Sequence, residues 1–346
     1  MPSSFVNLLV VFALLFAGVA QATNEDEPIH VVASFSILGD WVKQLGGDQV
    51  VVTSLLGEDE DVHVYKATPR DMALLSKADL LVINGLGLEG WMNRIVDASG
   101  YSGVTLIASK GVDVIAMEDE GHADHDHSHA HDHGSHDNDE GNADPHAWTS
   151  LRQAVHYINN ITAELMKLRP QAAEYFQKRN EDYIERINAL DARATEVFSG
   201  IPDEGKNIVI PHNSFAYLAR DYGFTVFSLT GMSTKSDTSA RQVAEVVRKV
   251  RSMGITAIFS ENIANTKLLE QLENETDVVI SGTLISGALS KNKAPDYLGM
   301  MEYNLDVLTN AMGKVRIDSD SSPMPEDHPH HEEHEHEHHE HDHHDH

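Results

Sequence analysis

Cysteine is absent from all 346 residues, which excludes disulfide bonds and metal sites built from thiolates. The absence also removes the side chain through which exported proteins are attached to lipid. Basic residues are scarce, since 25 Lys and Arg stand against 55 Asp and Glu, for a formal net charge of −30. Nucleic-acid binding needs clustered Lys and Arg, so we expect no nucleic-acid partner, whereas a surplus of carboxylates attracts cations.

The N-terminal segment has no Lys or Arg before residue 8, but a short apolar run from Leu8 to Ala20 ends in the small-residue pattern Ala20-Gln21-Ala22. This arrangement is typical of a secretory signal peptide and predicts removal of residues 1–22 by cleavage before Thr23. The run is short for a membrane span, and an uncleaved anchor is the alternative. Export without a lipid-bearing cysteine predicts a protein that is free in the periplasm.

Histidine is concentrated in two segments of low complexity. Residues 118–142 carry seven histidines among Asp, Gly, Ser and Ala, and residues 328–346 carry eleven with Glu and Asp. Neither segment offers apolar side chains for a core, so both are expected to be disordered without metal. Closely spaced imidazoles and carboxylates form many weak sites for Zn²⁺, which predicts metal capture. The alternatives are a solvated spacer and, for the tail, the remnant of an expression tag.

Strand-like apolar runs alternate with helical patterns in two parts of the chain, and the length suits two domains. The runs are Ile29–Ser34, Val50–Leu56, Leu80–Asn84 and Val104–Ala108 in the first part, and Asn207–Ile210, Thr225–Ser228, Ile255–Phe259 and Asp277–Ile280 in the second. Such alternation predicts two α/β lobes, each a mostly parallel sheet flanked by helices. Between two runs of the second part, Thr238–Met253 predicts a helix with one valine-rich buried face.

A long helical pattern joins the two parts, because the chain from Pro170 to Phe198 contains no Gly and no internal Pro. Its apolar face is Phe176, Tyr183, Ile187, Leu190, Ala194 and Val197. Pro170 suits the first turn of a helix and Gly200 its end, and the helix would span about 40 Å, enough to run along both lobes. The predicted domains are an N-terminal lobe at 23–165, a connecting helix at 166–200, a C-terminal lobe at 201–315 and a His-rich tail at 316–346.

Five histidines lie outside the His-rich segments: His30, His63, His146, His156 and His212. His63, His146 and His212 each lie near a predicted loop at the carboxyl end of an element, where open α/β sheets bind their ligands. Two belong to the first lobe and one to the second, so a cleft between the lobes can bring them together. A lone histidine is more often a hydrogen-bonded structural residue, and His30 and His156 are interpreted in this way.

Short motifs surround these histidines and recur at other places in the chain. They are ASFSILGDWVKQLGG (33–47), DVHVYKATPRD (61–71), NGLGLEGWM (84–92), DPHAW (144–148), PHNSFAYLARDYG (211–223) and YLGMMEYN (297–304). Taken in order over roughly residues 28–312, they resemble the metal-binding solute receptors of ABC importers for zinc and manganese, the cluster A-I family.

The resemblance implies two α/β lobes joined by one long helix, with a metal held between the lobes by His63, His146 and His212. In this family the third position is often Glu in manganese receptors and His in zinc receptors, so His212 favours Zn²⁺. The chemistry agrees, because three imidazoles suit Zn²⁺ better than Mn²⁺, which prefers oxygen. The resemblance further implies delivery of Zn²⁺ to a membrane ABC permease by a monomer, with a periplasmic zinc chaperone as a further partner.

The chain departs from the family pattern where a carboxylate commonly supplies the fourth ligand. Our alignment places Gly287 at that position, Ser150 where an Asp is usual, and Val62 where some zinc relatives have a ligand. The fourth position is therefore expected to hold water, or a His or Asp from residues 122–140. Glu261 and Asp296 are more distant alternatives, each interpreted first as a solvated or capping carboxylate.

Other function classes fit the sequence less well. A catalytic zinc hydrolase also has three ligands and an open position, but no HExxH helix or paired general base accompanies these histidines. We therefore expect no enzyme. A manganese or iron receptor is the closest alternative, and a His-rich zinc buffer or chaperone would need no ordered lobes.

Overall fold

The computed structural model describes residues 27–116, 143–235, 239–255, 257–264, 266–276 and 278–319. The predicted signal peptide, the His-rich segment 118–142 and the His-rich residues 328–346 lie outside the described residues. Within these ranges, no helix combines the length and the apolar composition that a membrane crossing requires.

The first lobe contains a four-stranded parallel sheet in the order β2-β1-β3-β4. Its strands are β1 (Ile29–Phe35), β2 (Val50–Leu56), β3 (Leu80–Ile83) and β4 (Val104–Ile107). Its helices are α1 (Ser36–Gly46), α2 (Pro69–Leu75), α3 (Met92–Ser99) and α4 (Leu151–Leu168), with short 3₁₀ turns η1 (Gly47–Gln49), η2 (Val62–Val64) and η4 (Ala147–Thr149). The start of α2 follows a local signal, since Thr68 and Asp71 form a capping box around Pro69.

The second lobe repeats this topology, with a parallel sheet in the order β6-β5-β7-β8. Its strands are β5 (Asn207–His212), β6 (Thr225–Thr230), β7 (Ala257–Glu261) and β8 (Ile280–Leu284). Its helices are α6 (Ala216–Tyr222), α7 (Ala240–Met253), α8 (Lys267–Thr276) and α9 (Tyr297–Ser319), and the 3₁₀ turn η6 (Asp203–Lys206) precedes β5. The structure therefore confirms the predicted fold of two α/β lobes.

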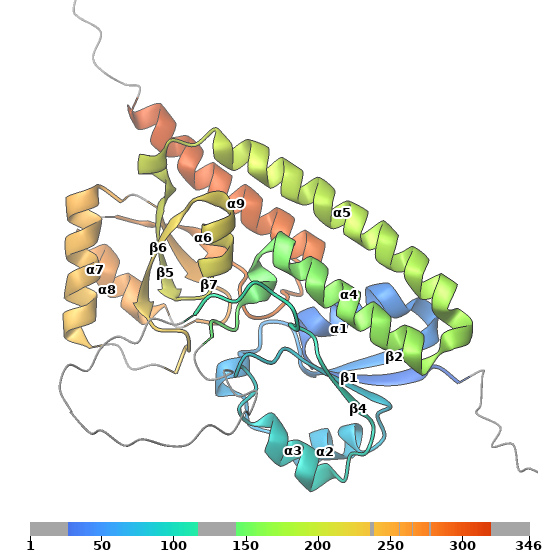
Figure 1. Ribbon diagram of the computed structural model, residues 1–346. Coiled ribbons are helices and arrows are strands. Elements are labelled where there is room, and N and C mark those ends of the chain that lie inside the picture. The colour runs from blue at the N-terminus through green and yellow to red at the C-terminus, as the bar shows by residue number, and fades with distance from the viewer. Residues whose placement is uncertain are drawn as a thin grey trace, which may run out of the picture.

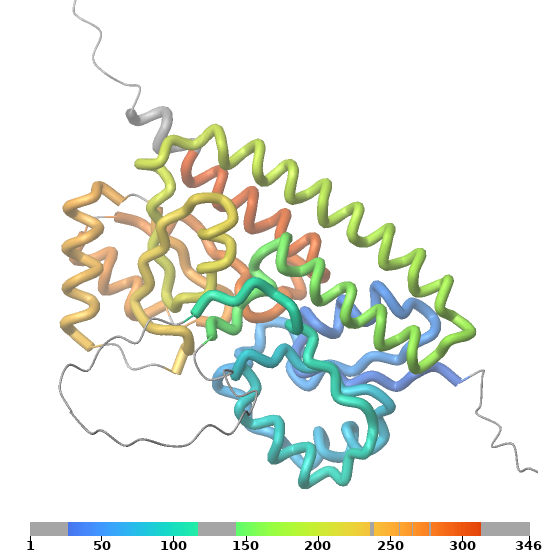
Figure 2. The backbone as a smooth tube through the Cα atoms, viewed as in Figure 1, coloured from blue at the N-terminus to red at the C-terminus, as the bar shows by residue number. Residues whose placement is uncertain are grey.

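The long helix α5 (Ala173–Ser199) runs along both lobes (Figure 1). It contacts α1 and α4 of the first lobe and α6 and α9 of the second. The tube in Figure 2 shows that the last helix, α9, lies beside α5. It begins next to the first lobe, where it contacts α1, and runs away from that lobe. Two long helices thus connect the lobes, on the side away from the carboxyl ends of the strands.

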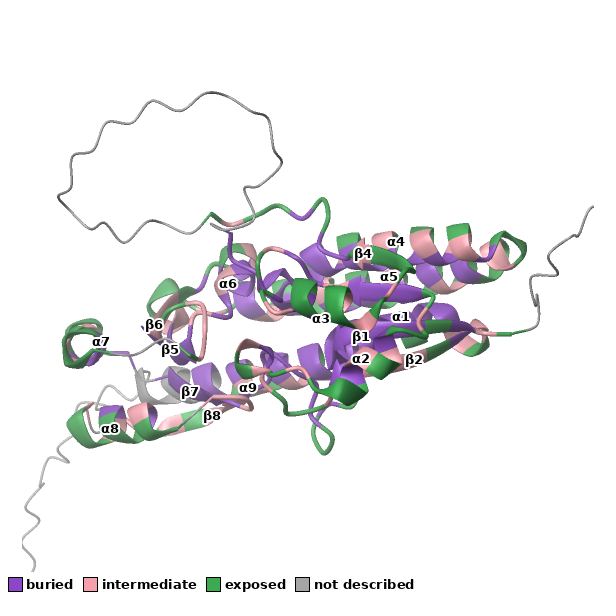
Figure 3. Ribbon diagram, turned by 90° about the horizontal axis from the view of Figure 1, so that it is seen from below, coloured by how far each residue is buried: buried purple, intermediate pink, exposed green. Residues whose placement is uncertain are grey.

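The hydrophobic core is continuous from one lobe to the other, as the buried elements in Figure 3 indicate. Trp41 of α1 packs against Tyr157 of α4 and Tyr297 of α9, with ring centroids 5.0 and 4.7 Å apart. A smaller core lies beneath α7 and α8 and contains the four valines predicted to face it. Because aromatic packing of this kind buries a large apolar area, it holds the lobes together as well as stabilising each one.

Several predicted boundaries were wrong by a few residues. Pro170 lies in a 3₁₀ turn, η5 (Pro170–Ala172), and α5 begins only at Ala173. Phe198 rather than Val197 ends the buried face of α5, because it lies four residues after Ala194. The last strand was predicted at Asp277–Ile280 but starts at Ile280, since pairing with β7 decides its register and Val279 is 73% exposed.

Candidate metal centre

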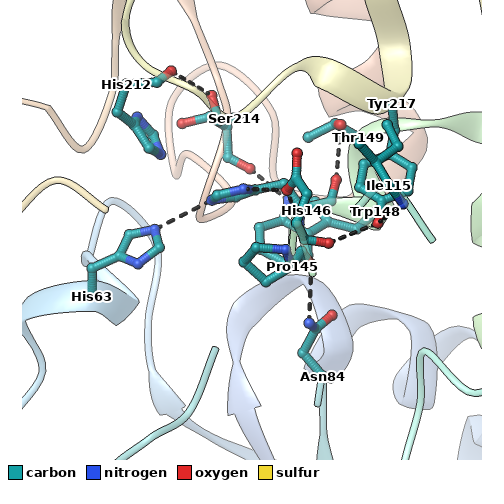
Figure 4. Close-up of polar contacts among 12 residues, drawn as sticks. His63, Asn84, Ile115, Pro145, His146, Trp148, Thr149, His212, Ser214 and Tyr217 are labelled. Atoms are coloured by element: carbon teal, nitrogen blue, oxygen red, sulfur yellow. Dashed lines mark hydrogen bonds and ion pairs between the residues drawn. The ribbon is translucent and has the colours of Figure 1, made fainter. Parts of the chain in front are cut away.

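The three predicted ligand histidines converge at the carboxyl ends of the strands (Figure 4). His63 lies in η2, after β2, and His212 is the last residue of β5, paired with Thr230. His146 lies in the loop directly before η4 and α4. Each element therefore delivers one imidazole to the same edge of the two sheets, where parallel α/β folds bind ligands.

The histidine cluster, His63, His146 and His212, is compact. One ring nitrogen from each residue lies within 4.8 Å of those of the other two, and the Nε2 atoms of His63 and His146 are 3.3 Å apart. His146 and His212 are buried, with 0% and 1% of their surface exposed, whereas His63 is half-buried. Nε2 of His212 is buried and has no hydrogen-bond partner among the described residues.

Asp144 orients His146 from two residues before it. The carboxylate oxygen Oδ1 accepts a hydrogen bond from the backbone N–H of His146 at 2.9 Å and lies 2.8 Å from its Nδ1 atom. Because Nδ1 faces a carboxylate, it carries the proton and leaves the lone pair of Nε2 directed at the cluster. Asn84 supports this loop from below by donating to the carbonyl of Pro145 at 3.0 Å.

Glu261 orients His212 in the same manner, although it lies 49 residues away in the sequence. Its carboxylate contacts Nδ1 of His212 and accepts from the backbone N–H of His212 at 3.2 Å. The hydroxyl of Ser214 donates to Oε2 of Glu261 at 3.0 Å. Glu261 itself is the last residue of β7, next to β5 in the sheet, and is 3% exposed.

Asp61 fixes the backbone at His63 and connects the lobes. Its Oδ1 atom accepts from the backbone N–H of His63 at 2.9 Å, which caps η2. Its Oδ2 atom accepts from the hydroxyl of Thr234 in the second lobe at 2.5 Å. The loop that carries His63 is thus attached to the opposite lobe beside the cluster.

The electrostatic surroundings give two of the imidazoles opposite pKa shifts. Burial, the two neighbouring imidazoles and Lys235 lower the pKa of His63 to about 3, so this ring is neutral at physiological pH. Burial also acts to lower the pKa of His212, but the charge and hydrogen bond of Glu261 outweigh it and raise that pKa above its usual value. Burial acts to raise the pKa of Glu261, yet His212 lowers it overall, so the carboxylate stays ionised.

The residues considered for the fourth ligand position have other roles. Gly287 has no side chain, and a Cβ atom there would lie 2.5 Å from Cδ1 of Ile263. Ser150 caps α4 by accepting from the backbone N–H of Gln153, and Val62 is buried. Asp296 is a capping carboxylate, as predicted, since it accepts from the backbone N–H of Gly299 at 2.7 Å. Within the described ranges, the cluster contains no fourth His or carboxylate ligand.

The interpretation of Glu261 as a solvated carboxylate was wrong, because the strand end buries it against His212. Its position was a usable signal, since it ends a buried strand at the edge where ligands bind. Asp61 and Asp144 were also missed as orienting groups, although each lies two residues before a histidine, the spacing at which Asp binds local backbone N–H groups. His30 and His156 are exposed and lie outside the cluster.

The sequence of this chain is similar to those of known metal-binding proteins of ABC importers. A profile of the family described as "ZnuA: Zinc-uptake complex component A periplasmic" matches residues 31–311. The manganese ABC transporter substrate-binding lipoprotein PsaA of Streptococcus anginosus is 29% identical over 320 residues, which cover 89% of this chain and 98% of the relative. The iron-binding protein YfeA of Yersinia pestis is 29% identical over 312 residues, covering 88% of this chain and 94% of the relative.

Among solved structures, the periplasmic zinc-binding protein TroA of Treponema pallidum superimposes with a TM-score of 0.73 at 27% identity. The superposition covers 83% of this chain and 99% of TroA. The names of these proteins include zinc, manganese and iron, so the similarity identifies a divalent metal site without selecting one metal.

Proposed function

The chain belongs to the family of the periplasmic zinc-uptake component A, the solute-binding proteins of metal ABC importers, and from this premise we propose that it captures Zn²⁺ in the periplasm and delivers it to a membrane ABC permease. In this proposal Zn²⁺ is the transported substrate, and His63, His146 and His212 are its ligands. The family consists of transport proteins rather than enzymes.

The main support for this proposal is that the Nε2 atom of His212 is buried and has no hydrogen-bond partner among the described residues. A buried polar atom without a partner is costly, and few remain in folded proteins. Here the atom lies within 4.8 Å of a ring nitrogen of His63 and of His146, and the Nδ1 atoms of His146 and His212 are held by carboxylates. A metal ion bound by the three Nε2 atoms satisfies all of them at once, and the outer carboxylates are the partners that metal-binding histidines usually have.

The chemistry of the ligands supports Zn²⁺ over Mn²⁺. Zn²⁺ accepts three imidazoles and one further ligand in a tetrahedral arrangement, whereas Mn²⁺ favours carboxylate, carbonyl and water oxygens. The cluster offers nitrogen alone among the described residues. A manganese or iron receptor is the alternative, because relatives carry those names.

The remaining assignments follow from the same proposal. Residues 1–22 are a signal peptide, 23–165 and 201–315 are the two lobes, and 166–200 connect them. Residues 118–142 and the tail at 316–346 collect Zn²⁺ for the cluster, although α9 extends into the start of that tail, to Ser319. The mature protein is a periplasmic monomer that also accepts Zn²⁺ from a periplasmic zinc chaperone.

Metal analysis of the purified protein tests the choice of metal. The chain is produced in medium containing equal Zn²⁺, Mn²⁺ and Fe²⁺, and weakly held ions are then removed by dialysis against a mild chelator. We expect one Zn²⁺ per chain to remain. One retained Mn²⁺ or Fe²⁺ would identify the alternative receptor, and loss of all metal would indicate a buffer with only weak sites.

A further inference from the structure

A cavity of about 600 Å³ opens beside the histidine cluster, and His63 forms part of its wall. The wall comes from both lobes, since it includes Trp91 from the first lobe and Ser233 from the second. His63 is also the one cluster residue that is not fully buried. A ligand in the cavity therefore approaches a bound metal from the side of His63.

Three cationic side chains line this cavity: Lys66, Arg94 and Lys235. None of them forms an ion pair or a side-chain hydrogen bond with another described residue, and no described Asp or Glu lines the same wall. This is unusual in a chain with 55 Asp and Glu against 25 Lys and Arg. The charge beside the metal centre thus has the sign opposite to that of the whole chain.

These cations oppose the binding of a metal ion unless a negative charge separates them from it. Three neutral imidazoles leave the full charge of a divalent metal in place, and like charges repel. Three carboxylates lie beside the cluster. Asp144 and Glu261 are paired with the Nδ1 atoms of His146 and His212, and Asp61 accepts from the backbone N–H of His63 and the hydroxyl of Thr234. None of the three lines the cavity, so among the described residues no carboxylate stands between the cations and the metal, and a bound anion would supply that negative charge.

We propose that the cavity binds a small polycarboxylate anion, such as a di- or tricarboxylate, together with the metal. One carboxylate oxygen occupies the fourth metal position, and the other carboxylates pair with Lys66, Arg94 and Lys235. Carboxylate oxygen is an ordinary zinc ligand, and several cations around a cavity of this size match an anion with several charged groups. The inference rests on the proposed function and specifies the form in which the metal is held.

Equilibrium dialysis with radiolabelled citrate tests the proposal on the full-length chain loaded with one equivalent of Zn²⁺. We expect one citrate to be retained per zinc-loaded chain and none by the metal-free chain. The triple variant Lys66→Gln/Arg94→Gln/Lys235→Gln should bind citrate at least tenfold more weakly while still holding Zn²⁺. A matched triple variant, Lys167→Gln/Lys178→Gln/Arg248→Gln, removes the same charge from exposed positions that do not line the cavity and should retain citrate normally.

Two further experiments test whether the bound citrate lies at the zinc-loaded cluster and whether the site prefers a polycarboxylate to phosphate. In His63→Ala, where zinc is left to the His-rich segments, citrate retention should disappear, and retention equal to that of the parent would overturn the proposal. Unlabelled phosphate should displace citrate poorly, and equally strong displacement would contradict a polycarboxylate site. If the parent holds Zn²⁺ tightly but retains no citrate, this inference fails alone; if it holds no Zn²⁺ tightly, the proposed function fails.

Discussion

The imidazole of His212 and the carboxylate of Glu261 form a buried pair, in which Nδ1 lies 3.0 Å from Oε1 and 2.9 Å from Oε2. The two residues end adjacent strands, β5 and β7, so the sheet itself holds them in register. The pair fixes the ring with Nε2 toward His63 and His146 and places a negative charge behind it.

Replacement of Glu261 should therefore weaken metal binding without removing a ligand. We expect Glu261→Gln to lower zinc affinity about 10- to 100-fold, as is typical when an outer partner of a metal-binding histidine is lost. The amide keeps an acceptor oxygen for the backbone N–H of His212, so the fold should persist. Competition titration against a chromophoric chelator measures the change, with the exposed Glu245→Gln as control. Affinity equal to that of the parent would show that Glu261 does not act through His212.

The three cluster histidines should be far more sensitive than the two outside it. His63→Ala, His146→Ala and His212→Ala should each lower the zinc affinity of the tight site by more than roughly 100-fold. Loss of an outer partner of a metal-binding histidine lowers affinity by at most about that factor. His30→Ala and His156→Ala should leave the tight site unchanged, because both side chains are exposed and neither belongs to the cluster. Isothermal titration calorimetry with zinc in a competing chelator compares all five. Full affinity in the His212 variant would refute the ligand assignment.

Zinc affinity should depend on pH through His212 rather than His63. Metal binds the neutral ring, so a proton competes for His212 below its pKa, which Glu261 raises above 6.5 against the effect of burial. Zinc affinity should therefore begin to fall as the pH drops through the raised pKa of His212. His63, with a pKa of about 3, stays neutral in that range and adds nothing. In Glu261→Gln the decline should move to lower pH, and an unchanged midpoint would exclude His212 as the titrating group.

The His-rich segments should increase the number of zinc ions that the chain binds, but they should not form the tight site. Ala116 and Ala143 pair as an antiparallel bridge, so residues 118–142 can be replaced by a short glycine linker without moving either anchor. Deleting them together with residues 320–346 should reduce the number of zinc ions bound at saturation and leave one tightly held ion per chain. Metal counting at saturating and at stoichiometric zinc distinguishes the two effects. Loss of the tight ion would locate metal binding in the segments rather than in the lobes.

Asp40 should make the folded protein less stable as pH rises. Burial raises the pKa of this carboxyl from 3.8 to about 6, although the backbone N–H of Tyr297 and the amide of Gln44 donate to it. Because the folded state binds the proton more tightly, the free energy of unfolding falls between pH 3.8 and about 6, by up to about 3 kcal/mol. Asp40→Asn keeps an acceptor for Tyr297, so it should stabilise the protein at pH 7 by on the order of 1–3 kcal/mol.

Urea unfolding of the parent and of Asp40→Asn at pH 4, 6 and 7.5 checks this expectation. The control is Asp97→Asn, an exposed carboxyl on α3. The prediction fails if the parent and the Asp40 variant show the same dependence of unfolding free energy on pH.

The sequence by itself predicted most of the elements and the three histidines that the structure brings together. Alternation of apolar runs and helical patterns is a local property, and it gave two parallel sheets and α5 because side chains repeat every two residues in strands and every 3.6 in helices. His63, His146 and His212 could be selected because each lies near a predicted loop and because the motifs around them resemble those of a family of metal receptors.

Only the tertiary structure decided which groups surround those histidines. β8 begins later than its apolar run because pairing with β7 sets its register, and Glu261 meets His212 because two strands far apart in sequence are neighbours in the sheet. The contact of Asp61 with Thr234 likewise spans 173 positions and depends on how the lobes pack. Hydrogen bonds of this kind join residues that are far apart in the sequence, so the orientation, charge and burial of the histidine cluster are decided only when the chain is folded.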